Sequence, residues 1–224
     1  MKKTILFLTA VLVAAVPLSA RQQPQLAPSQ AQDSPKCKMF DTGGPGGVGY
    51  LEYLLTTTKD AKVTEKPLGE MGGKDKAAFF AVIASAGDVP EQKGMRIHLE
   101  KTDTGCSEDV YLDYAGSDGR PEGLGHFEDE LRSLVTRKEM FLKDPPYPPG
   151  GYPTTSAYNR CPVPDAAGRP CGGNFFHASW WPVPDGPGVI LTSTKKRGSY
   201  YFPGADLQRV VDMVARARAF LSAN

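Results

Sequence analysis

The chain has 224 residues, and its 26 lysines and arginines nearly balance its 25 aspartates and glutamates, which gives a formal net charge of +1. This balance argues against a strongly basic nucleic-acid-binding protein and against a polyacidic disordered chain. Hydrophobic residues make up 40% of the chain, and the 24 glycines and 20 prolines stay below the share typical of low-complexity sequence. A packed core is therefore expected.

The N-terminus has the pattern of a secretory signal peptide. Two lysines precede an apolar run from Ile5 to Val16, and a helix-breaking proline and a small residue at the expected cleavage site, Ala20, follow it. The run is shorter than the roughly 20 residues that a membrane span needs. We expect cleavage near Ala20 and a secreted or periplasmic protein without stable membrane insertion. Loss of residues 1–20 removes two positive charges and no negative one, so the formal charge of the mature chain is −1.

The mature chain begins with a polar segment. Residues 21–36 are rich in Gln, Pro and Ala and show no apolar periodicity, which predicts a disordered linker. The remaining residues, 37–224, are predicted to form a single α+β domain. This domain divides into two candidate halves, 37–142 and 143–224.

The chain has four cysteines, Cys37, Cys106, Cys161 and Cys171. An even number in an exported chain predicts two disulfide bonds, for which three pairings exist. We favour a Cys161–Cys171 bond, since only nine turn-forming residues separate the two, and this leaves Cys37 to pair with Cys106. The cysteine spacing does not match zinc-binding pairs, and we expect neither a metal site nor a cofactor.

In the first half, residues 48–58 are rich in Tyr, Leu and Thr and favour a strand, with a short helical turn at 48–55 as the alternative. Residues 59–75 are charged and are interrupted by proline and glycine, which predicts a loop. Residues 77–86 are apolar throughout, as in a buried central strand.

Two alternating segments follow. In residues 95–100 the inward positions are Met95, Ile97 and Leu99, and residues 110–114 alternate in the same way, so the two segments are predicted to form a hairpin. An amphipathic helix is predicted over Phe127–Leu142.

The second half begins with a long Pro-rich loop. Residues 143–187 contain eleven prolines, and within them 174–181 is a short strand candidate. Residues 189–194 and 199–202 are predicted to form a second hairpin, and an amphipathic helix begins near residue 206.

These elements predict an α+β fold of antiparallel sheet with two amphipathic helices. The first half has the order ββββα and the second βββα. Two related β-β-β-(β)-α units from a degenerate duplication and a common pattern that arose twice both explain this order, and no match between individual residues separates the two.

Aromatic residues in and beside the Pro-rich loop are the candidate ligand-binding residues: Tyr147, Tyr152, Tyr158, Trp180 and Trp181. Exposed rigid aromatics are common in recognition surfaces. The alternative is that they fill the core beneath a long loop. Trp180 and Trp181 point to opposite faces of their predicted strand, so at least one of them is expected to be buried.

The G-x-S-x-G and H-E-x-x-H motifs of hydrolases are absent from the sequence. Two weaker arrangements remain, an outward-facing pair of His98 and Asp113 across the predicted hairpin, and His177 with Ser179 on one strand face. His126 is interpreted as a residue at the start of a helix.

We therefore expect an exported binding or structural module whose partner is a glycan or peptide component of the cell envelope, and no nucleic acid. The alternative is a secreted hydrolase that uses His98/Asp113 or His177/Ser179. A further alternative is a fold like that of single-stranded nucleic-acid-binding proteins, without that function.

Overall fold

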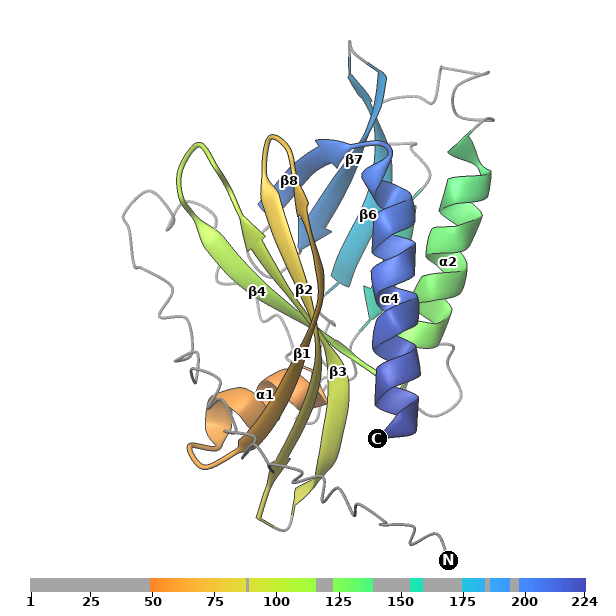
Figure 1. The fold of residues 1–224 in the computed structure, drawn as a ribbon. Helices are drawn as coiled ribbons and strands as arrows, with labels where there is room; N and C mark the ends of the chain where they lie inside the picture. The colour runs from red at the N-terminus through yellow and green to blue at the C-terminus, as the bar shows by residue number, and fades with distance from the viewer. Residues whose placement is uncertain are drawn as a thin grey trace, which may run out of the picture. The chain divides into compact units, whose positions relative to one another are not determined.

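A computed structural model describes residues 49–87, 89–115, 123–138, 154–158, 175–183, 186–193 and 198–224. These residues form two four-stranded antiparallel sheets and three helices, and all of them belong to the same compact unit of the chain. The predicted α+β class is confirmed. A short helix comes first, and two series of four strands and a helix follow it (Figure 1).

The first sheet is an antiparallel meander. Its strands are β1 (Lys62–Gly72), β2 (Lys76–Ala86), β3 (Val89–Glu100) and β4 (Ser107–Asp113), and each pairs with the next. The buried strand and the hairpin predicted from the sequence are confirmed. The predicted inward residues of β3 have no exposed surface, as the alternation requires.

The second sheet repeats this topology. It contains β5 (Thr154–Tyr158), β6 (Phe175–Val183), β7 (Gly186–Ser193) and β8 (Gly198–Pro203). The last three strands were predicted, whereas β5 lies inside the predicted Pro-rich loop. Five residues give a weak local signal, and β5 is defined by its antiparallel pairing with β6.

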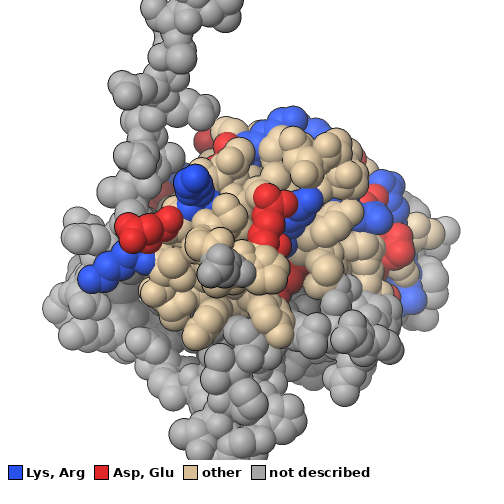
Figure 2. Space-filling view, turned by 90° about the horizontal axis from the view of Figure 1, so that it is seen from below, with Lys and Arg blue, Asp and Glu red and all other residues tan. Residues whose placement is uncertain are grey.

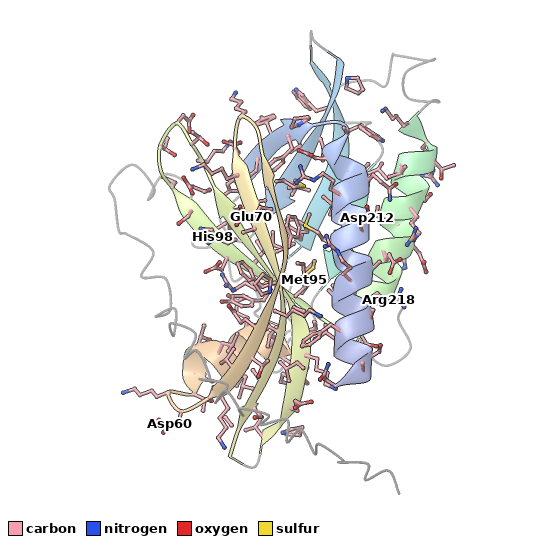
Figure 3. All side chains as sticks on the ribbon, viewed as in Figure 1. Asp60, Glu70, Met95, His98, Asp212 and Arg218 are labelled. Atoms are coloured by element: carbon pink, nitrogen blue, oxygen red, sulfur yellow. The ribbon has the colours of Figure 1, made fainter. Side chains whose placement is uncertain are left out.

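Two helices, α2 (Leu124–Thr136) and α4 (Asp206–Ala223), lie side by side next to the sheets (Figure 1). Met95 of the first sheet points toward them (Figure 3), and apolar residues of both helices and both sheets form one core. The Glu128 carboxylate of α2 accepts hydrogen bonds from Arg132 of the same helix and, at 2.7 Å, from Arg218 of α4. The helix predicted over Phe127–Leu142 begins three residues earlier, at Leu124, and α2 ends at Thr136; residues 139–142 lie outside the described residues.

The strand predicted over residues 48–58 is wrong, because Tyr50–Thr57 form helix α1. The alternative, a helical turn at 48–55, is close to what is observed. Leu51 and Leu54 are buried against β2, on the face of the first sheet that α2 and α4 do not cover.

The cause of this difference lies on β4. Gly49, the N-cap residue of α1, provides no side-chain cap. Instead, the Asp113 carboxylate accepts hydrogen bonds from the backbone N–H groups of Tyr50 (3.0 Å) and Leu51 (3.1 Å). A cap from a distant strand, together with buried leucines, outweighs the local preference of the threonines for a strand.

The loop predicted over residues 59–75 is also wrong, because most of it forms β1. β1 is an edge strand, where a proline does not break a ladder of hydrogen bonds on both sides. The register with β2 shifts between Pro67 and Gly69, and Gly69 has a φ of 151° that only glycine adopts easily. Charged residues and proline therefore indicate a protected sheet edge here rather than a loop.

Several predictions fall on residues that the structure does not describe. They are the signal peptide (1–20), the linker (21–36), Tyr147, Tyr152, and the cysteines Cys37, Cys161 and Cys171. Cys106 is buried at the start of β4, and the described residues include no free cysteine. Within the described part of the chain, every helix is too short or too polar to cross a membrane.

Candidate functional site

Asp75, in the turn between β1 and β2, forms hydrogen bonds to strand β8 of the second sheet. The Asp75 carboxylate accepts hydrogen bonds from the Tyr201 backbone N–H (2.8 Å) and from the Lys101 ammonium (3.0 Å). The Asp75 backbone N–H in turn donates to the Tyr201 carbonyl at 3.3 Å. The backbone N–H and carbonyl of Tyr201 are thus both hydrogen-bonded to the turn of the first sheet.

The Tyr201 ring is the centre of an aromatic cluster, by which we mean Trp181, Tyr201, Lys74 and Lys101. Trp181 packs against Tyr201 in an edge-to-face arrangement, with 6.4 Å between ring centroids, and remains 37% exposed. The ammonium groups of Lys74 and Lys101 lie 5.1 and 4.8 Å from the Tyr201 centroid. The Tyr201 ring therefore contacts both an accessible indole and two cations.

Neutral polar groups share a sheet face with this cluster. His177 and Ser179 lie on the same face of β6 as Trp181, as predicted, because side chains alternate along a strand. His177 is opposite Thr192, whose hydroxyl lies 3.4 Å from that of Ser199. Burial lowers the pKa of His177 below its usual value, so its imidazole is neutral at pH 7.

Trp180 was predicted to bind a ligand, but the structure shows that it is buried. Its side chain is 1% exposed, and its indole N–H donates to the Leu134 carbonyl of α2 at 2.9 Å. The prediction that at least one tryptophan is buried is confirmed, and Trp180 is not accessible to a ligand at the surface. Of the other predicted residues, Tyr158 is described only through its backbone in β5.

A second polar cluster lies on the face of the first sheet that points away from α2 and α4. His98 is on this side (Figure 3), and its Nδ1 lies 3.0 Å from Asp109 Oδ1. The predicted pair of His98 and Asp113 is wrong, because the register places Asp109 opposite His98 and Asp113 opposite Gly94. Asp113 caps α1 instead.

Arg96 fixes the position of Asp109. Its guanidinium forms two 2.8 Å hydrogen bonds to Glu65 and one of 3.1 Å to Asp109, and it stacks 4.1 Å from the Phe80 centroid. Burial alone would raise the pKa of Asp109, but the hydrogen bond from His98 and the charge of Arg96 hold it below its usual value.

An ionised Asp109 can only accept, so the proton of this contact is on Nδ1 of His98. In the neutral tautomer that this contact selects, Nε2 of His98 carries the lone pair, and no described residue hydrogen-bonds to it. The same buried surroundings, reinforced by the charge of Asp109, raise the pKa of Tyr111 to about 12. The arrangement provides a positioned base, but not a phenolate nucleophile.

A cavity of about 390 Å³ lies beside Asp113. Its lining includes Tyr50, Glu91, Lys93 and Tyr114. Burial raises the pKa of Asp113 to about 6, against the opposing effect of its two backbone hydrogen bonds. This carboxylate changes its charge within the range of pH in which many proteins work.

Among the described residues, no group of three or more His, Cys, Asp or Glu side chains could hold a metal ion. Charges on the face seen in Figure 2 alternate in sign, with uncharged residues between them. This face of the described chain therefore presents no extended surface of one charge.

Comparison of the chain with models of known protein families, with curated proteins and with solved structures gives no match.

The sequence did not indicate Tyr201, Lys74 or Asp109 as site residues. Asp109 lies at an outward position of β4, but only the hairpin register, which alternation does not determine, identifies it as the partner of His98. Tyr201 and Lys74 come together only where the two sheets meet, and no local sequence pattern predicts that contact.

Proposed function

We propose that this chain is an exported module that binds a glycan of the cell envelope on the aromatic cluster. The observation that carries the proposal is the exposed Trp181 ring, which packs edge-to-face on Tyr201, on the sheet face that also carries Ser179 and the neutral imidazole of His177. A sugar ring has an apolar C–H face that packs on an indole, and hydroxyl groups that exchange hydrogen bonds with neutral polar side chains.

The hydrogen bonds of β8 favour a glycan over an extended peptide. Peptides commonly bind to sheets by adding a strand at a free edge. At Tyr201 the backbone N–H and carbonyl of β8 are both bonded to Asp75. The ligand is therefore expected to lie on the face of the sheet, where side chains recognise it.

Isothermal titration of the mature protein with chitohexaose, alongside co-sedimentation with purified peptidoglycan, tests this proposal. We expect Trp181→Ala to weaken binding about tenfold, in line with the contribution of one aromatic contact. Tyr53→Ala is the matched control, because Tyr53 is an aromatic residue of α1 with a similar exposed fraction, 39%. Absence of saturable binding to both glycans, or equal loss in the two variants, would contradict the proposal.

A secreted hydrolase is the second candidate, and the contact between His98 and Asp109 is the observation that favours it. In this mechanism Asp109 orients the imidazole, and Nε2 of His98 removes a proton from a water molecule that attacks the substrate. His177 and Ser179 share a strand face and remain the other candidate pair.

Assays with ester, glycoside and peptide substrates distinguish the two candidates. A hydrolase should lose activity in both His98→Gln and Asp109→Asn, whereas His126→Gln, a change in the first turn of α2, should have no effect. The binding proposal expects no turnover in any of these proteins.

Export, two disulfide bonds and the absence of a nucleic-acid partner belong to the same proposal. The mass of the mature protein should correspond to cleavage near Ala20. Non-reducing peptide maps should join Cys161 to Cys171 and Cys37 to Cys106.

Titration with single-stranded DNA should give no binding, in keeping with the formal charge of −1 that follows from removal of residues 1–20. Binding of DNA would instead support a fold like that of single-stranded nucleic-acid-binding proteins. It would also show that this protein itself binds nucleic acid.

A further inference from the structure

A groove between β1 and the C-terminal half of α4 combines an apolar floor with two cations. It has a volume of about 420 Å³, which is within the range of small-molecule sites. Its lining includes Lys66, Leu68, Arg216, Ala219, Phe220 and Ala223.

Neither cation forms an ion pair with a carboxylate in the described part of the chain. The Lys66 ammonium lies 4.7 Å from the centroid of the Phe220 ring, and Arg216 Nε donates to the Asp212 backbone carbonyl at 3.3 Å. The ligand that complements such a groove carries an anionic group at one end of an apolar chain.

The geometry of β1 argues against an extended peptide as the occupant. β1 is the edge of its sheet, where a peptide could add as a further strand. However, Pro67 has no N–H to donate, and the register is irregular between Pro67 and Gly69, where β1 borders the groove. Recognition in this groove therefore depends on side chains rather than on backbone pairing.

We propose that this groove binds a medium-chain fatty acid. Its carboxylate lies near Lys66 and Arg216, and its acyl chain packs on Phe220 and Ala223. From Arg216 to Ala223 the helix rises about 10 Å, which gives an apolar surface of suitable length for such a chain. This site lies outside the aromatic cluster and is independent of glycan binding.

Isothermal titration of the mature protein with decanoate, below its micelle concentration, tests the inference, with decanol as the uncharged comparison. We expect saturable binding of decanoate and a loss of about two- to fivefold in either Lys66→Gln or Arg216→Gln, with a smaller effect on decanol. Ala219→Trp, which fills the floor of the groove, should abolish binding of both. Lys62→Gln is the matched control, because Lys62 is exposed on the same strand and does not line the groove.

Three results would overturn the inference. They are absence of saturable decanoate binding, equal effects of Lys66→Gln and Lys62→Gln, and binding of an acidic extended peptide in place of decanoate. In the first case the exposed charge of Lys66 serves only to protect the sheet edge. Thermal melts establish that each variant is folded, and Ala219→Leu replaces Ala219→Trp if the latter does not fold.

Discussion

The buried Asp113 carboxylate makes the stability of this protein depend on pH in a definite direction. Its pKa in the folded protein is about 6, against an ordinary value of 3.8, so the folded state binds a proton more tightly than the unfolded state does. One pKa unit corresponds to about 1.4 kcal/mol. The resulting stabilisation is present below pH 4 and is lost as the pH rises through 6. Between pH 4 and 7 this group alone should lower the free energy of unfolding by about 2 kcal/mol.

Asp113→Asn removes the titration and retains one carbonyl oxygen that can accept a hydrogen bond from α1. The assay is urea denaturation at pH 4, 5, 6 and 7, and the quantity to follow is the difference in free energy of unfolding between the protein and the variant. We expect this difference to fall by about 2 kcal/mol from pH 4 to 7, because the contributions of all other groups cancel in it.

Asp103→Asn, in the exposed turn between β3 and β4, is the control for the loss of a carboxylate as such. A constant difference for Asp113→Asn would refute the reasoning. A difference that grows with pH would show that hydrogen bonding to α1, rather than burial, determines the pKa of this carboxylate.

Two further pairs of variants test the packing by urea denaturation. Trp180→Phe should lower the free energy of unfolding by about 1–3 kcal/mol, because it removes a buried hydrogen bond to the last turn of α2, whereas the partly exposed Trp181→Phe should change it by less than about 0.5 kcal/mol. Gly94→Ala should cost more than about 2 kcal/mol, because its Cβ would overlap the Leu112 carbonyl. Gly72→Ala should be close to neutral, since no atom lies within 4 Å of the added Cβ. Equal effects within either pair would contradict the packing described above.

The alternation of side chains along β3 and β4 could be predicted from sequence, but the register between these strands could not. Asp109 and Asp113 are both at outward positions of β4, so the pattern identifies the correct face for each of them. Which of the two lies opposite His98 depends on where the hairpin turns. A two-residue period gives no information on that point.

The aromatic pair in β6 shows the same limit. Alternation separates Trp180 from Trp181, and it predicts that the two tryptophans have different surroundings. The choice of the buried one depends on which side of the sheet α2 covers, which is a property of the tertiary structure.

Helix α1 and strand β1 could not be predicted for a different reason. The start of α1 is stabilised by Asp113, about sixty residues away in the sequence. β1 keeps Pro67 and its charges because it is an edge strand. In both cases the deciding contact is absent from any window of local sequence.

The contact of Asp75 with β8 has a consequence for the two candidate halves of the chain. A peptide N–H and a carboxylate from a turn of the first half occupy the positions that a neighbouring strand would take at Tyr201. Separated from residues 37–142, the second half would present this strand with unpaired backbone groups, a template for self-association. We therefore expect that the repeated order of elements does not give two autonomous folding units, because Asp75 of the first half covers the backbone of β8 at Tyr201.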